Sequence, residues 1–328
     1  MVRSNEGTCF PMSLFRSVRT ISQAEGAGPI DWEAVEQAAT EAISPGTLEL
    51  TSAQRNGYLT DVRDARAAVT STANLDFSVP ATFEVQNRHH WMEANIETFQ
   101  RLMEPLAARQ PTPMPGAALV VNTATMTAAL AFLGRHVLGQ YDPLLLADEG
   151  EHGLYFVHPN IERVAKELDV DRDRFRRWIA FHEVTHAAEF GAAPWLPDVL
   201  EQNLLEGIDA LGHGKLDRDA FRALDATMTA VEGYAELLMD EAFDRDTADL
   251  RRKLDERRRR GGPIAAIFRR ILGLEIKRRQ YERGREFFQA VVNKRGIAAA
   301  GAVWERPEHL PEWEEFDHPG RWLSRVDP

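Results

Sequence analysis

The chain has 328 residues, of which 44% are hydrophobic and 27% charged, and its formal net charge is −12 at pH 7. This composition is typical of a globular protein with a substantial core, in one large or two ordinary domains. The acidic balance argues against nonspecific nucleic-acid binding, which needs a basic surface. The single cysteine, Cys9, excludes an intramolecular disulfide bond.

Residues 1–30 are expected to form a poorly ordered lead-in, followed by a helical region over residues 31–110. The lead-in has no continuous apolar segment of the kind a secretory signal needs, so a cytoplasmic location is the default expectation. Apolar periodicity and turn residues predict the elements of the helical region. They are helices over 31–43, 54–69 and 91–108, a short strand over 83–87 and a linker over 110–116.

Residues 111–328 are expected to form a catalytic region with a C-terminal tail, in one compact unit with the helical region before it. Its longest apolar stretch, 117–138, is interrupted by polar residues such as Asn122 and Arg135. A buried strand and helix explain this stretch better than a membrane span, and no membrane interaction is expected. The β-rich segments 118–122 and 153–158 are the strand candidates.

The segment from His182 to His186 reads His-Glu-Val-Thr-His, the H-E-x-x-H pattern of zinc enzymes. It lies in a predicted helix that follows Asp171, a capping residue, and ends at Gly191. Residues four apart share one helix face, so both imidazoles can bind one Zn²⁺. Glu183 is placed to act as general base on a water held by the metal. The alternative is a pair of histidines with a structural role.

A catalytic zinc needs a third protein ligand, and a predicted helix over 226–240 offers carboxylates for it. Glu232 is the preferred ligand, and Gly233 beside it would let another helix or the metal approach closely. Glu236 lies on the same face one turn later, so it is an alternative ligand or an acceptor for an imidazole N–H. Asp240 is a weaker candidate for such a supporting role.

From about residue 30 to its end, the chain resembles the zincin-like metallopeptidases of type 2, a bacterial family with one branch linked to biosynthesis of a deazaflavin coenzyme. The resemblance rests on blocks that occur in the family's order. These blocks begin at Arg88, Leu138, Leu154, Phe181, Pro194, Glu232 and Arg279. The resemblance implies that His182 and His186 are metal ligands, that Glu183 is the base and that Glu232 opens the second metal-binding block. Many members have histidine where this chain has Tyr234.

The expected fold is mainly α with a small β-sheet, in a zincin-like metallohydrolase architecture. In that architecture a strand edge borders the metal cleft and binds extended substrate, and the segment 155–158 is the candidate for this edge. A donor to the developing oxyanion would help catalysis. His158, Tyr234 and Tyr281 are candidates for that role, with Tyr281 preferred, although each is also explained by a structural role.

Two features of the C-terminal half need no catalytic explanation. The charged run 251–263 mixes acidic with basic residues and ends in Gly-Gly-Pro, which is typical of a solvated helix end and loop. Contact with an anion or an acidic substrate is the alternative. Trp304, Trp313 and Trp322 stand among prolines, which indicates a tail that packs over the core through its aromatic rings.

The motif favours a zinc-dependent hydrolase of the glutamate-zincin type, most simply a metallopeptidase that acts on a peptide or small amide. One alternative is a non-catalytic zincin-fold protein whose metal holds helices together or supports partner binding. The intact Glu183 argues against it, because a structural site needs no base. Another alternative keeps the zinc chemistry but acts on a non-peptide amide or ester.

Overall fold

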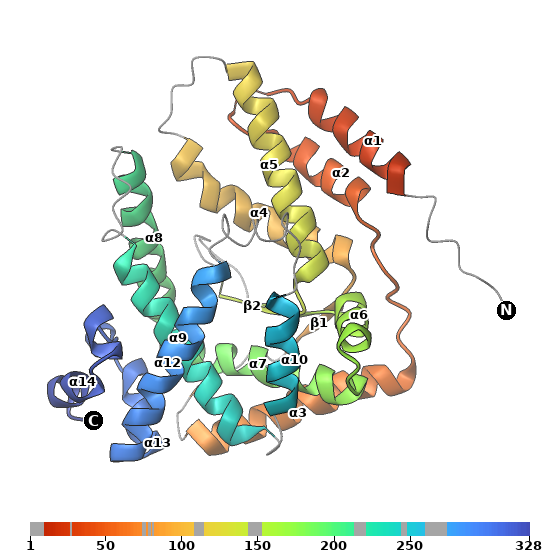
Figure 1. The fold of residues 1–328 in the computed structure, drawn as a ribbon. Helices are drawn as coiled ribbons and strands as arrows, with labels where there is room; N and C mark the ends of the chain where they lie inside the picture. The colour runs from red at the N-terminus through yellow and green to blue at the C-terminus, as the bar shows by residue number, and fades with distance from the viewer. Residues whose placement is uncertain are drawn as a thin grey trace. The chain divides into compact units, whose positions relative to one another are not determined.

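The protein is described here by a computed structural model (Figure 1). It describes residues 10–26, 28–73, 77, 80, 82–107, 115–143, 153–212, 221–243, 248–259 and 274–328. The chain forms two units, and each is assembled from separate segments. Unit 1 contains residues 1–48, 85–138 and 157–160, and unit 2 contains residues 49–84, 139–156 and 161–328. The linear order of regions along the sequence therefore does not define either unit.

Unit 1 is a helical unit with one apolar core. Its helices are α1 (Phe10–Ser22), α2 (Trp32–Ala42), α4 (Arg88–Ala107) and α5 (Pro115–His136). The Asp31 side chain caps α2 by accepting the Ala34 N–H at 3.0 Å, as expected for an N-cap residue. Helix α1 lies in the segment that was expected to be irregular. The core is formed by Val35, Ala39, Trp91, Met92, Ile96, Met126, Leu130, Ala131 and Val157.

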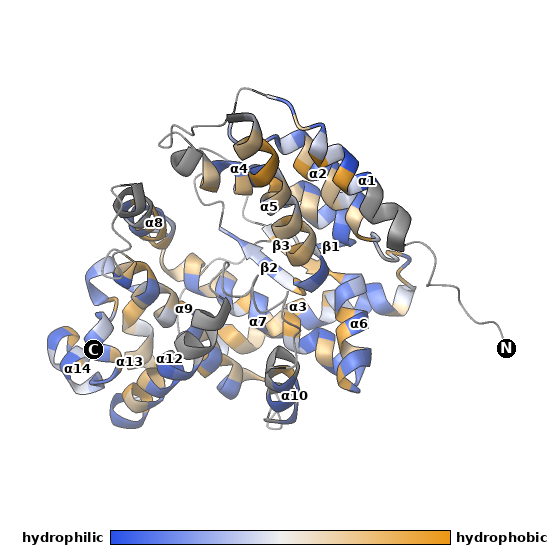
Figure 2. Ribbon diagram, turned by 45° about the horizontal axis from the view of Figure 1, so that its top comes forward, coloured by the Kyte–Doolittle hydropathy of each residue, from blue (hydrophilic) through white to orange (hydrophobic). Residues whose placement is uncertain are grey.

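Helix α5 corrects one prediction: residues 118–122 are helical and do not form a strand. Hydrophobic residues run along most of α5 (Figure 2), and a continuous apolar run has no period that separates a buried strand from a buried helix. Packing against α2 decides between them. Thr123, for example, is fully buried, and its hydroxyl accepts the Asp31 N–H at 3.0 Å. By length and composition alone, 116–136 could also span a membrane.

Unit 2 carries the remaining helices and most of the sheet. Its helices include α3 (Ser52–Ala73), α7 (Arg172–Ala192), α8 (Leu196–Gly212), α9 (Arg222–Ala242), α10 (Ala248–Arg259), α12 (Leu274–Arg295), α13 (Ile297–Gly301) and α14 (Pro319–Val326). Short 3₁₀ turns, such as η3 (Trp313–Phe316), join the last helices. The helices predicted over 54–69 and 226–240 are confirmed as α3 and α9. Helix α10 confirms the start of the charged run as helical, and residues 260–263 lie outside the described residues.

The sheet has the strand order β1-β3-β2, with β1 at Glu84–Gln86, β2 at Gly139–Asp142 and β3 at Gly153–Val157. Strands β2 and β3 are antiparallel, with Gly139 opposite Phe156 and Asp142 opposite Gly153. Strand β3 is therefore central, which corrects the prediction that 155–158 forms an edge. Among the strands that the structure describes, β2 lies at an edge of the sheet, although its sequence did not predict a strand. His158 begins α6 (His158–Leu168) and does not continue β3.

Helices α9 and α12 pack with their backbones in close contact. A Cβ atom at Gly233 of α9 would lie 2.4 Å from the Cα of Gly284 in α12. The expectation that Gly233 admits a close neighbour is thus confirmed, and that neighbour is a helix. The C-terminal tail also packs as expected. Trp304 and Trp322 are buried, while Trp313 lies under the Arg283 guanidinium at 3.8 Å.

Candidate metal centre

Helix α7 presents the H-E-x-x-H residues from a rigid position in unit 2. Asp171 caps the helix by accepting the Arg174 N–H at 2.8 Å, as the sequence predicted. Farther along α7, the Trp178 and His182 rings are nearly parallel, with their centroids 5.7 Å apart. Arg176 of the same helix donates to Asp61 of α3 at 2.7 Å, and both side chains are largely buried. The backbone that carries the two histidines is therefore held by helix–helix packing.

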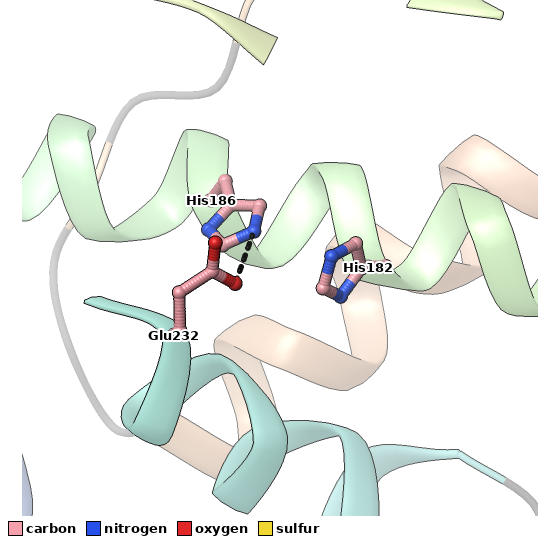
Figure 3. Close-up of side chains that lie close together, drawn as sticks. All are labelled: His182, His186 and Glu232. Carbon is pink, nitrogen blue, oxygen red and sulfur yellow. Dashed lines mark ion pairs between the residues drawn. The ribbon is translucent and has the colours of Figure 1, made fainter. Parts of the chain in front are cut away.

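His182, His186 and Glu232 lie together (Figure 3). Each offers one ligand atom, and these atoms lie within 4.8 Å of one another. The two imidazoles come from successive turns of α7, and the buried Glu232 comes from α9. The Nε2 atom of His186 is 3.8 Å from Oε2 of Glu232. This arrangement matches the three residues that the sequence proposed as ligands.

Glu183 points to the edge strand β2. Its Oε2 accepts the Tyr141 N–H at 3.1 Å, and its side chain is only 7% exposed. Gly139, at the start of β2, leaves room for it, because a Cβ there would lie 2.6 Å from Glu183 Cγ. Glu183 is not one of the three residues whose ligand atoms converge. The contact with the strand explains the close packing of β2 on α7.

Glu189 was not singled out from the sequence, yet it contacts a proposed ligand directly. It is fully buried on α7, and its Oε2 accepts the Nδ1–H of His186 at 2.9 Å. The spacing i, i+3 from His186 was the available signal, because residues three apart share a helix face. Glu236, which the sequence offered for such a role, is half-buried on α9 one turn after Glu232.

The ionisable groups around His186 act strongly on one another's pKa. Burial disfavours the His186 imidazolium, but the hydrogen bond and charge of Glu189, with the charges of Glu232 and Glu183, outweigh burial and raise the His186 pKa to about 9. Burial raises the pKa of Glu189 to about 7 despite its bond to His186. The pair therefore retains a proton through neutral pH in the absence of metal.

The other candidate residues are distributed as follows. Asp240 forms an ion pair with Arg285 of α12 at 2.9 Å. Tyr234 is fully buried between Phe288 and Trp304, at centroid distances of 5.3 and 5.4 Å, which favours a structural role over oxyanion binding. His158 is buried and belongs to unit 1, whereas the three ligand candidates belong to unit 2. The side chain of Tyr281 lies outside the described residues.

The donor set fits a divalent metal ion. Two imidazole nitrogens and one carboxylate are the ligands of one well-known class of catalytic zinc site. The surroundings are acidic: Glu183, Glu189 and Glu232 are all buried close to the two histidines. A buried carboxylate is costly unless a positive charge or hydrogen bonds compensate it, and a bound cation supplies that charge.

Comparisons with known proteins identify the class of protein to which this fold and this site belong. The zincin-like metallopeptidase family matches residues 30–216 and 198–323. The chain therefore belongs to this family. No curated protein matches it in sequence.

Among solved structures, a protein from Chloroflexus aurantiacus is similar, with 30% identity and a TM-score of 0.71 over 96% of this chain and 98% of that one. That protein is a provisionally assigned hydrolase, and its fold is described as novel. The two comparisons support a hydrolase role, and the family implies a bound metal.

Proposed function

We propose that the protein is a zinc-dependent metallopeptidase of the glutamate-zincin type. The observation that carries this proposal is the convergence of His182, His186 and Glu232 with ligand atoms within 4.8 Å, beside a glutamate that is not part of that group. These three residues would hold the ion. When bound, zinc acts as a Lewis acid that polarises a carbonyl group and makes a nearby water more acidic.

The protein's own residues supply the proton transfers. Glu183 accepts a proton from the attacking water and passes it to the leaving nitrogen of the cleaved amide. Its bond to the Tyr141 N–H holds the carboxylate at the β2 edge. A peptide in extended conformation can pair with an edge strand, and β2 runs past the proposed base. Within the described part of the sheet, β2 is the edge strand adjacent to Glu183, and this position supports a peptide as the substrate.

A paired set of variants tests the proposal. Glu183→Gln is expected to keep about one zinc per chain and to lower turnover by roughly 10²–10⁴-fold, because it removes the proton acceptor only. His186→Ala is expected to lose zinc and thermal stability together, because a metal that binds only the native state stabilises that state. Zinc content, melting temperature and cleavage of a peptide library are measured for both.

The same library is run beside small amides and esters, with Glu183→Gln as the blank. Cleavage confined to small amides or esters would move the substrate to the non-peptide alternative. If Glu183→Gln loses zinc as readily as His186→Ala, Glu183 is structural and the catalytic assignment is wrong. A wild-type protein that contains no zinc after purification and reconstitution would overturn the metal site itself.

A further inference from the structure

We propose that Glu189 is a positioning residue of the metal centre that fixes the direction and tautomer of the His186 ring. The inference rests on the zinc site of the proposed function, but not on hydrolysis. The two ring nitrogens of His186 have different neighbours. Nδ1 lies 2.9 Å from Oε2 of Glu189, and Nε2 lies 3.8 Å from Oε2 of Glu232.

The different neighbours of the two ring nitrogens determine which nitrogen of His186 is available to a metal. A neutral imidazole carries one hydrogen, and the nitrogen that carries it cannot be a ligand. A carboxylate that accepts the Nδ1–H holds the hydrogen at Nδ1 and leaves the Nε2 lone pair for the ion. The same bond makes the ring a stronger donor to the metal. Nε2 is the atom on the Glu232 side, where the ligand atoms converge (Figure 3).

The burial of Glu189 is the second observation that supports this role. Its side chain is fully buried, and its Oε1 has no hydrogen-bond partner among the residues that the structure describes. A buried carboxylate with so few partners is destabilising on its own. Its hydrogen-bond partner among these residues is His186, so a cation bound to that ring compensates the carboxylate through the imidazole. A purely structural glutamate at this depth would be expected to have an Arg or Lys partner.

The geometry also explains why α7 can supply both groups. His186 and Glu189 are three residues apart, so they stand on the same face of one helix. His186 and Glu189 therefore keep their relative position when α7 moves. Glu232, in contrast, comes from α9 and depends on the packing of a second helix.

The test compares Glu189→Ala, Glu189→Gln and a matched control, Glu315→Gln. Glu315 is also a buried carboxylate of unit 2, but it accepts from Arg325 at 2.7 Å near the C-terminus. Zn²⁺ affinity is measured by competition with a chelator, and the Co²⁺-loaded protein is measured by absorption spectroscopy. The metal-free melting temperature of each variant shows whether it folds.

Glu189→Ala is expected to weaken Zn²⁺ binding by about 10- to 100-fold and to change the Co²⁺ spectrum, because the ring is no longer held. Glu189→Gln is expected to weaken Zn²⁺ binding less, because its amide oxygen can still accept the Nδ1–H of His186. Glu315→Gln is expected to lower the melting temperature but to keep the wild-type affinity and spectrum.

A Glu189→Ala protein that binds Zn²⁺ within about twofold of wild type, with an unchanged Co²⁺ spectrum, would overturn the inference. If Glu189→Ala does not fold, Glu189→Met, which fills a similar space without an oxygen acceptor, decides the question by the same two measurements. A wild-type protein that binds no Zn²⁺ would overturn both this inference and the proposed function. If wild type binds Zn²⁺ but cleaves nothing, only the proposed hydrolysis fails.

Discussion

A side chain at Gly139 would collide with Glu183: a Cβ atom there would lie 2.6 Å from Glu183 Cγ and 2.8 Å from its Oε1. The proposed base and the edge strand β2 therefore fit together only because residue 139 has no side chain. The same carboxylate accepts the N–H of Tyr141, two residues along the strand. The direction of Glu183 thus depends on a strand far from it in sequence.

Gly139→Ala is expected to lower turnover while zinc content stays at the wild-type level. The added methyl group displaces the Glu183 side chain and leaves the three ligand residues in place. A small displacement of a catalytic group can cost on the order of 100-fold in rate. Turnover and zinc content are measured together, with Gly116→Ala as control, because a Cβ at that position meets nothing within 4 Å. Loss of zinc from Gly139→Ala would show that the strand supports the metal site rather than the base.

Gly233→Ala is expected to destabilise the fold and to weaken zinc binding. Its Cβ would lie 2.4 Å from backbone atoms of Gly284, which cannot move away as a flexible side chain can. Overpacking of this kind costs about 1–3 kcal/mol or more, and the shift of α9 carries Glu232 with it.

Thermal melting and Zn²⁺ affinity test the prediction. Gly320→Ala is the control, because the nearest neighbour of a Cβ atom at that position would be Lys294 Nζ at 3.9 Å. Gly284→Ala overpacks the same pair of helices from α12, because its Cβ would lie 2.3 Å from the Thr229 carbonyl oxygen and 2.8 Å from Gly233 Cα. The double variant is therefore expected to lose less stability than the sum of the single losses. Additive losses would indicate two independent contacts.

The two glutamates of α9 are expected to differ in their effect on the metal. Glu232→Gln should weaken Zn²⁺ binding strongly, because a neutral amide is a poorer ligand than a carboxylate. Glu236→Gln should weaken Zn²⁺ binding by no more than about 10- to 100-fold, the range for a residue that supports a ligand. Chelator competition measures both affinities, and the reverse order would assign the third ligand to Glu236.

Zinc affinity is expected to rise with pH between about 6.5 and 9. In the metal-free protein the charges of Glu189, Glu232 and Glu183 outweigh burial and raise the His186 pKa to about 9. Its imidazolium therefore stabilises the metal-free fold below its ordinary pKa, and this contribution is lost as the pH rises through about 9. Zinc must displace that proton, so binding strengthens by up to about tenfold per pH unit.

Chelator competition at several pH values, with the proton binding of the chelator included, gives this dependence. Calorimetry in buffers with different ionisation enthalpies gives the number of protons released. Zinc affinity that does not change over this range would show that His186 is already neutral before the metal binds.

Local sequence patterns were enough to predict the parts of the site that lie on single helices. The spacing of His182 and His186 defines one helix face whatever surrounds it, and the Asp171 cap is a local hydrogen bond. The periodicity of α9 likewise placed Glu232 beside an apolar face, and the family resemblance is confirmed over most of the chain. The roles of these residues as ligands and base stay predictions.

Which elements meet depends on contacts between segments that are distant in sequence. The tertiary structure selected Glu189 on α7 as the partner of His186 Nδ1, although Glu236 had the same chemistry. It made β2 the edge strand beside Glu183, and it made 118–122 part of a helix. One cause explains all three outcomes. A sequence pattern shows which side chains share a face, whereas hydrogen bonds and packing between distant segments decide what that face contacts.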